Sequence, residues 1–160
     1  MSDISNLDDA LDMIAGVGSI TGTEAKAREI AETINKGFGE LARQYIAGRN
    51  RIAYLIWKDP YMAAGRDTFI NDVIERAGWI NAVELCRYPE MSAADIRQAA
   101  PDRIFLSSEP YPFKHKHIAE CREICPDAEI VVVDGEMFSW YGSRLLSAPD
   151  YLQTLCAERG

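Results

Sequence analysis

The sequence predicts an α/β fold: a three-layer α/β/α lobe with a mostly parallel sheet, preceded by a long helix. From residue 51 onward, apolar runs of strand length alternate with amphipathic helical segments, which is the order of strand–helix–strand units with parallel strands. Before residue 51, apolar residues recur at three- and four-residue steps, as on one face of a helix. About 24 residues at 1.5 Å each span about 36 Å, which is longer than a compact domain of this size needs.

Composition indicates an ordinary globular chain and argues against some partners. Of the 160 residues, 48% are hydrophobic and 26% are charged, so we expect one domain with a substantial core. The formal net charge of −8 leaves no excess of basic residues for a nucleic acid or an anionic membrane. No apolar run is long enough for membrane insertion, and the acidic start MSDISNLDDALDMIAG lacks the basic segment of a signal peptide. The chain is therefore expected to stay where it is made, unless it is a fragment.

The first 48 residues are expected to form a helical unit, and residues 49–160 an α/β lobe. Residues 7–16 are predicted to be a short helix that Asn6 caps, and the following GVGSITG is predicted to break it. The long helix then extends to about residue 48, with Gly37 and Gly39 marking a bend. Its apolar stripe consists of Ala27, Ile30, Ile34, Phe38, Leu41 and Tyr45.

The lobe is expected to contain three main strands and the helices between them. The predicted strands are RIAYLIW at 51–57, DRIFLSS at 102–108 and AEIVVVDG at 128–135, and the predicted helices lie at 68–78, 92–99 and 115–125. Gly78 is a good residue to follow a helix end. Cys121 and Cys125 share one helix face and are interpreted as free thiols in or near the core, since a zinc site would need a second close pair.

Three loops follow the predicted strands: WKDPYMAAGRD, SSEPYPFK and DGEMFSWYGSR. In parallel sheets, ligands bind beyond the carboxyl ends of the strands. Aromatic rings in these loops, with Phe113, Phe138 and Tyr141 among them, would form a wide surface for a large, partly apolar ligand. The residues expected to bind that ligand are Trp57, Tyr61, Glu109, Tyr111, Trp140 and Arg144. Arg144 is suited to an anionic group, and its competing role is an ion pair with Glu109 or Glu136.

A metal-dependent enzyme is the alternative. Glu109, Asp134 and Glu136 could together bind a divalent cation, or Asp134 could cap a turn while the two glutamates pair with basic residues. No phosphate-binding glycine loop or serine-nucleophile motif is present. His115 and His117 flank a lysine at a helix start and are predicted to be solvated surface residues. The aromatic surface and the lack of a histidine base favour non-catalytic binding, without a metal site or a cofactor.

Three segments resemble a known family. They are AYLIWKDPYMAAGRDTFINDVIERAGWIN (53–81), PDRIFLSSEPYPFKHKHIAE (101–120) and VVVDGEMFSWYGSRLL (131–146). They are similar to the C-terminal lobe of helical-backbone substrate-binding proteins, which serve ABC importers for cobalamin, haem and ferric siderophores. The resemblance covers about residues 7–147. It implies a Rossmann-like lobe and a long helix that acts as a rigid strut between two lobes.

The resemblance also implies a ligand, partners and a location. The expected ligand is a metal chelate or a corrinoid, and the expected partner is an ABC permease that Glu75 would contact from an outward-facing helix. The family's N-terminal lobe would precede residue 1, so we expect a fragment or a half that pairs with a missing lobe or with a second copy. The long helix would then expose an apolar face. The family is periplasmic, but without a signal peptide a cytoplasmic location stays open.

Overall fold

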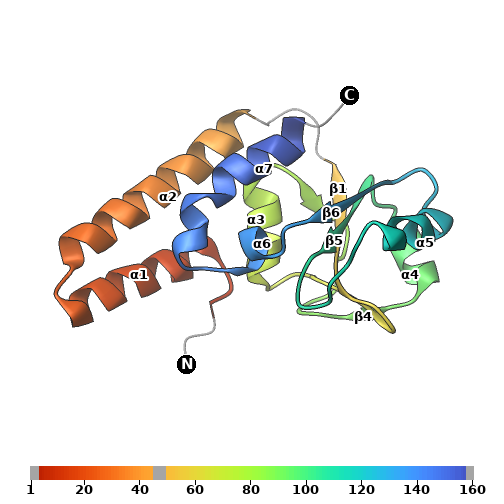
Figure 1. Cartoon of the computed structure of the whole chain (residues 1–160), viewed down its shortest axis with the longest axis horizontal. Helices are drawn as coiled ribbons and strands as arrows, with labels where there is room; N and C mark the ends of the chain where they lie inside the picture. The colour runs from red at the N-terminus through yellow and green to blue at the C-terminus, as the bar shows by residue number, and fades with distance from the viewer. Residues whose placement is uncertain (1–3, 45–49, 158–160) are drawn as a thin grey trace.

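The computed structural model describes residues 4–44 and 50–157 and has the predicted α/β architecture (Figure 1). The helices are α1 (Leu7–Thr21), α2 (Glu24–Gln44), α3 (Phe69–Arg76), α4 (Ala93–Gln98), α5 (Lys116–Ile124), α6 (Glu136–Ser139), the 3-10 helix η1 (Ser143–Leu146) and α7 (Ala148–Ala157). The strands are β1 (Arg51–Trp57), β2 (Tyr61–Ala63), β3 (Ile80–Asn81), β4 (Glu90–Met91), β5 (Arg103–Ser107) and β6 (Glu129–Val133). No helix among these residues is long and apolar enough to cross a membrane.

The sheet is mostly parallel, as predicted. Its strand order is β4-β2-β1-β5-β6, and β3 pairs in parallel with the start of β1. The β1–β5 and β5–β6 pairs are parallel, whereas β2 and β4 are antiparallel at one edge. Residues 58–67 were expected to be a loop, and this is wrong at β2, where Ala63 pairs with Leu55. The chain reverses directly after β1, so β2 can pair with the strand it has just left.

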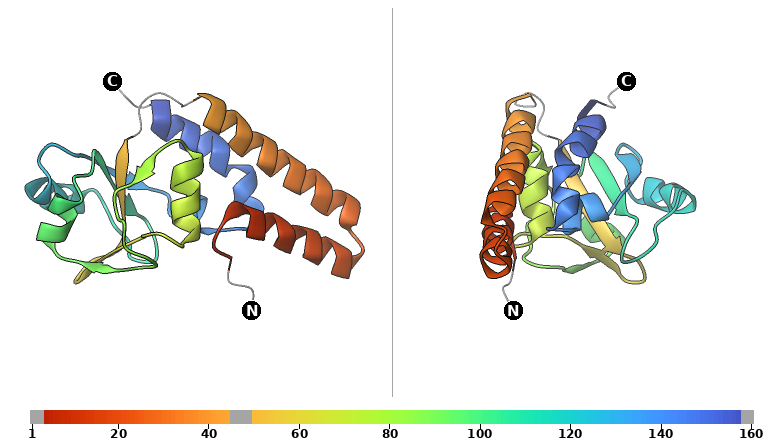
Figure 2. Two further views of the ribbon diagram at one scale, coloured as in Figure 1. Left: turned by 180° about the vertical axis from the view of Figure 1, so that it is seen from behind. Right: turned by 60° about the vertical axis from the view of Figure 1, so that its left-hand side comes forward.

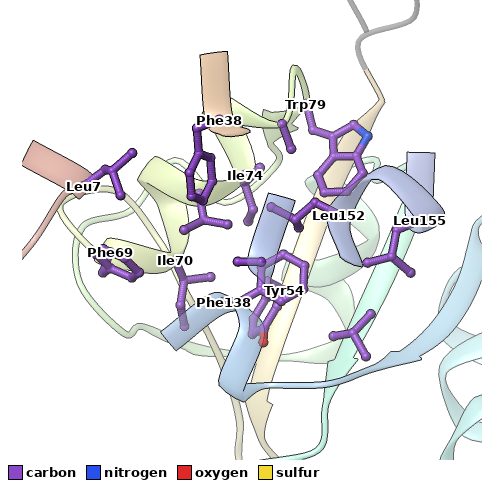
Figure 3. Close-up of a cluster of buried hydrophobic side chains, with 14 of the residues drawn as sticks. Leu7, Phe38, Tyr54, Phe69, Ile70, Ile74, Trp79, Phe138, Leu152 and Leu155 are labelled. Atoms are coloured by element: carbon purple, nitrogen blue, oxygen red, sulfur yellow. The ribbon is translucent and has the colours of Figure 1, made fainter. Parts of the chain in front are cut away.

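Helices cover both faces of the sheet (Figure 1). Side chains alternate between faces along each strand, so Tyr54 and Phe105 point to the side of α3, α6 and α7, while Leu55 and Leu106 point to the side of α4 and α5. Figure 3 shows the first of these cores, in which Phe38 from α2 and Leu152 from α7 meet the strand side chains. All of these residues are buried.

The first helix is longer than expected. Asn6 caps α1 as predicted, by accepting a hydrogen bond from the N–H of Asp9. The prediction that GVGSITG breaks the helix at residue 16 is wrong, because α1 continues to Thr21 and ends at Gly22, which has a φ of 68°. A side chain at Gly18 would place its Cβ 2.4 Å from that of Ala27, so this glycine allows α1 and α2 to pack closely.

The long helix α2 is confirmed, but its apolar face is covered. Ile34 and Phe38 are buried, and α1 folds back along α2 as an antiparallel hairpin (Figure 2). The predicted exposed apolar face on this helix is wrong, because the exposed large hydrophobic residues nearby are Val17 (53%) and Ile20 (88%) of α1, and none of the described α2 residues is among them. The predicted helix end at residue 48, and Tyr45, lie outside the described residues.

Two contacts fix α7 between α2 and the sheet. A Cβ at Gly37 would lie 2.8 Å from Cγ of Pro149, so α7 packs directly on the α2 backbone at this glycine. On the other side, the buried guanidinium of Arg103 donates from Nη1 to the carbonyl oxygen of Leu155 at 2.8 Å and pairs with Glu129. The position of α7 thus depends on a residue of the long helix and on a residue of β5.

Candidate functional site

The three predicted loops do arise at one edge of the sheet. The parallel strands β1, β5 and β6 end at Trp57, Ser107 and Val133, and Ser107 lies directly opposite Val133 in the register. The N–H of Ser108 donates to the carbonyl oxygen of Val133 at 2.9 Å, which keeps the two chain segments side by side beyond the strands. The topology therefore brings the residues that follow these strands to a common edge.

Trp57 and Tyr111 form the first aromatic pair of this edge. Their ring centroids are 5.5 Å apart in an edge-to-face arrangement, and Trp57 remains 41% exposed. The N–H of Tyr111 donates to the carbonyl oxygen of Ile56 at 3.4 Å, so the loop after β5 lies against the end of β1. Phe113 was expected in the exposed surface, but this is wrong, because the ring is buried in the core beneath α5.

Trp140 and Glu109 form the second contact. The indole Nε1–H of Trp140 donates to Oε1 of Glu109 at 2.7 Å, and the hydroxyl of Ser139 donates to the same oxygen at 3.1 Å. Trp140 is 51% exposed. A cavity of about 350 Å³ opens beside the ring, and its lining includes Ser139, Tyr141 and Gly142. This is a hollow with an aromatic wall and a fixed carboxylate at its side.

The loops after β5 and β6 are held together by buried polar contacts. The N–H of Gly135 donates to the hydroxyl oxygen of Ser108 at 3.0 Å. The hydroxyl of Ser107 donates to the carbonyl oxygen of Glu109 at 2.5 Å and accepts from the buried hydroxyl of Tyr54 at 3.1 Å. A Cβ at Gly135 would lie 2.4 Å from the Ser107 hydroxyl oxygen, so only glycine fits between the loops. The base of the candidate site is therefore tightly packed.

Phe138 belongs to this base and not to the exposed surface. It was expected among the surface rings, but it is fully buried and lies 4.9 Å from the ring of Tyr54, centroid to centroid. Phe138 lies in the short α6 and points into the core (Figure 3), whereas Trp140, which follows α6, is 51% exposed.

The three carboxylates of the metal hypothesis are separately engaged. Oδ1 of Asp134 accepts from the N–H of Glu136 at 3.1 Å and so closes the turn after β6. Glu136 pairs with Arg144 at 2.5 Å, and Glu109 is bound to Trp140. Within residues 4–44 and 50–157, no three histidine, cysteine or acidic side chains are grouped so that they could hold a metal ion. Asp134 thus has the capping role and Glu136 the ion-pair role considered above, whereas Glu109 accepts hydrogen bonds from Trp140 and Ser139 and not from a basic residue.

Tyr61 lies at the start of β2 and contacts α5. Its hydroxyl is hydrogen-bonded to the thiol of Cys121. Burial raises the pKa of Tyr61 to about 12. Lys58, in the same turn, pairs with Glu120 of α5. The structure therefore brings Trp57 together with Tyr111, Trp140 with Glu109, and Arg144 with Glu136, whereas Tyr61 is half-buried against the helix.

Glu75 lies in the last turn of α3. Its side chain is exposed, in agreement with the expected outward orientation, and its role in docking stays a prediction. The thiols of Cys121 and Cys125 are buried and free, as the sequence indicated.

The expectation that His117 is a surface residue is wrong. It is only 4% exposed and packs against the rings of Tyr111 and Phe113. The spacing of this residue from Cys121, four positions along the helix, was the available signal, because two residues so spaced share a face and Cys121 was already assigned to the core. His117 supports a residue of the candidate site from beneath.

The chain matches no protein-family model and no curated protein. Solved structures do resemble it. One, described as a possible iron-binding (periplasmic solute-binding) protein from Staphylococcus epidermidis, has a TM-score of 0.80 and 18% identity over 97% of this chain and 63% of its own. The periplasmic haem-binding protein HutB of Vibrio cholerae has a TM-score of 0.80 and 20% identity, and the match covers 94% of this chain and 63% of HutB. The periplasmic vitamin B12-binding protein BtuF of Vibrio cholerae has a TM-score of 0.77 and 17% identity, and the match covers 99% of this chain and 65% of BtuF.

These similarities concern the fold. The chain spans less than two thirds of the length of each of these three proteins, while nearly all of it is covered. The resemblance that the sequence suggested is thereby confirmed for the architecture, including the long helix and the mostly parallel sheet. The chain has the fold found in periplasmic substrate-binding proteins for haem, vitamin B12 and iron.

Proposed function

We propose that this chain is a ligand-binding part of an ABC importer's substrate-binding protein, and that it binds a metal chelate or corrinoid such as haem, cobalamin or a ferric siderophore. The main support is the fold it shares with haem- and vitamin B12-binding proteins over nearly its whole length. In this proposal the chain is non-catalytic and acts in the periplasm. Its partner would be an ABC permease, with Glu75 on the docking side.

The candidate site supports a flat ligand with anionic groups. Trp57 with Tyr111, and Trp140 beside its cavity, offer ring faces and edges against which a macrocycle or chelate can pack. Arg144 is a permanent cation at the same loop. Its partner Glu136 contacts it as an ion pair without a well-directed hydrogen bond, so an anionic ligand group can compete for the guanidinium.

The proposal includes a second wall for the ligand. A single set of loops removes water from one face of a flat ligand only, so affinity of this chain alone should be weak. The other wall would come from another part of a longer protein, or from a partner chain such as a second copy. That division follows from the shorter span of this chain relative to the proteins it resembles.

A spectral titration tests the proposal. The chain is titrated separately with hemin, cyanocobalamin and a ferric hydroxamate, and absorbance changes report binding. Trp140→Ala should weaken binding of the active ligand about tenfold, because a stacking ring is lost. Leu85→Ala is the matched control, since Leu85 is exposed but lines a different cavity together with Arg51, at the opposite end of β1 from Trp57. Absence of binding to all three probes, or equal effects of the two substitutions, would contradict the proposal.

A further inference from the structure

His117 is a buried titratable residue directly behind the candidate site. It lies in the first turn of α5, and its ring centroid is 5.6 Å from that of Tyr111 and 5.4 Å from that of Phe113. Tyr111 in turn contacts Trp57. The imidazole is thus one ring away from the exposed aromatic pair, although it does not itself reach the surface.

The protonation state of His117 can be assigned from its hydrogen bond. Its Nδ1 accepts the backbone N–H of Lys114 at 2.9 Å, and an amide N–H can only donate. Nδ1 therefore carries no proton, and the ring is the neutral form with its proton on Nε2. The N–H of His117 also donates to the carbonyl oxygen of Lys114 at 2.9 Å, so residues 114 and 117 are bonded in both directions.

These two hydrogen bonds between residues 114 and 117 determine the path of the loop before α5. Phe113 donates its N–H to the carbonyl oxygen of Tyr111 at 2.8 Å, so residues 111–114 form one short hydrogen-bonded unit that ends on His117. The N-cap residue His115 makes no side-chain hydrogen bond at the start of α5. The hydrogen bond from the Lys114 N–H to the His117 ring therefore joins this unit to the helix, in addition to the buried ring of Phe113 and the bond from the Tyr111 N–H to the Ile56 carbonyl oxygen.

Protonation would remove that attachment. An imidazolium has N–H groups on both nitrogens, so Nδ1 could no longer accept the Lys114 N–H and the two N–H groups would face each other. The new charge would also be enclosed between two aromatic rings. The charged and titratable groups on the segments packed near the ring are Lys114, His115 and Tyr111 of the loop, Lys116, Glu120 and Cys121 of α5, and Lys58 and Tyr61, which contact Glu120 and Cys121 from the β1–β2 segment.

We propose that neutral His117 positions Tyr111 for ligand binding, and that protonation of His117 releases residues 111–114 and weakens binding as the pH falls. The ligand-binding part of this inference rests on the proposed function. Histidine is the side chain whose charge ordinarily changes between about pH 5 and 8, and this range sets the pH values for the tests.

An NMR titration of the full chain tests the structural part without a ligand. The imidazole signals of the two histidines and the amide signal of Lys114 are followed from pH 8 to pH 5. The Lys114 amide should shift with the same midpoint as the His117 imidazole, and the signal of exposed His115 is the reference. If the Lys114 amide shows no change at the His117 midpoint, the attachment is wrong.

Hemin titrations at pH 7.5 and pH 5.5 test the consequence. His117→Asn places an acceptor oxygen near the position of Nδ1 and cannot be protonated, and His115→Asn is the matched surface control. When the pH is lowered from 7.5 to 5.5, the hemin affinity of the wild type and of His115→Asn should fall by about fivefold more than that of His117→Asn. A fivefold change is the scale of one hydrogen bond. Equal losses in all three proteins would overturn the inference.

The two measurements separate this inference from the proposed function. If hemin binds at neither pH, the proposed function fails for haem, whereas the NMR titration still decides whether His117 controls the loop. The NMR titration uses the wild-type chain, so it also decides that question if His117→Asn fails to fold.

Discussion

Glu109 and Trp140 are joined by a hydrogen bond of 2.7 Å from the indole Nε1–H to the carboxylate Oε1. A carboxylate is a strong acceptor, and this bond connects the loop after β5 to the end of α6. Because Trp140 is half-exposed, little else restrains its ring. Glu109 is therefore placed to orient the ring that forms one wall of the candidate site.

Removal of that acceptor should weaken ligand binding more than it affects stability. Glu109→Ala is expected to lower hemin affinity about fivefold, because the Trp140 ring would lose its preferred orientation. Glu109→Gln keeps an acceptor oxygen and should lose less. Isothermal titration measures the affinities, and Glu84→Ala, which removes an exposed carboxylate elsewhere, is the control. A larger loss in the glutamine variant than in the alanine variant would contradict the positioning role.

Arg144 should matter for anionic ligands and little for folding. In its ion pair with Glu136, the Arg144 side chain is 48% exposed and the Glu136 side chain 28% exposed, and solvent-accessible pairs contribute about 0–1 kcal/mol to the free energy of unfolding. Arg144→Ala should therefore leave urea unfolding nearly unchanged but weaken hemin, which carries two carboxylates, more than uncharged cyanocobalamin. Arg144→Lys, which keeps the charge and loses the planar donor pair, should lie between. A similar loss for both ligands would argue against a charge contact.

Phe138 should be a determinant of stability. The ring is fully buried against Tyr54 and Phe105, so Phe138→Ala leaves a cavity and should lower the free energy of unfolding by about 3–5 kcal/mol. Leu146→Ala, at an exposed site in the neighbouring 3-10 helix, should cost less than about 1 kcal/mol. Urea unfolding followed by circular dichroism gives both values. Comparable losses would show that Phe138 is not part of the packed base.

Alkaline pH should destabilise the fold through buried Cys121. Burial raises the pKa of this thiol to about 11, whereas a thiol in the unfolded chain loses its proton near pH 8.5. The unfolded state therefore binds fewer protons above pH 8.5, so the free energy of unfolding should fall as the pH rises from there towards 11. Cys121→Ala should reduce that fall in urea unfolding at pH 8 and pH 10. Cys86→Ala is the comparison: a hydrogen bond with Asp67 raises the pKa of this thiol, but Cys86 is exposed, so its removal should reduce the fall less than Cys121→Ala does.

The order of the main elements could be predicted because the buried strands are continuous apolar runs. RIAYLIW became β1, and each later apolar run became the next parallel strand. The strand β2 could not be predicted, because its three residues are too few for a period to appear. The end of α1 was predicted wrongly for a different reason, which concerns Gly18. Glycine usually interrupts a helix, but here it allows contact with Ala27, and only the tertiary structure reveals that contact.

The sequence predicted which loops form the candidate site, but it did not predict which aromatic rings in those loops are exposed. Topology alone places Trp57, Tyr111 and Trp140 beyond the same strand ends. It does not tell which aromatic residues point inward, and so Phe113 and Phe138 were assigned to the surface. The direction of each ring depends on how its loop folds back, which is determined by contacts distant in sequence, such as those of Ser107 and Gly135.

The absent side chain at Gly37 has a geometric consequence for the whole molecule. Pro149 packs on the α2 backbone there, so α2 and α7 lie closer together at that point than a side chain on residue 37 would allow. A methyl group would act as a spacer between them. From Gly37 to the start of α2 is about 20 Å along the helix axis, so a slight tilt at this contact would be multiplied at the far end, where α1 turns back. Gly37→Ala would thus change the angle at which the helical hairpin projects from the lobe.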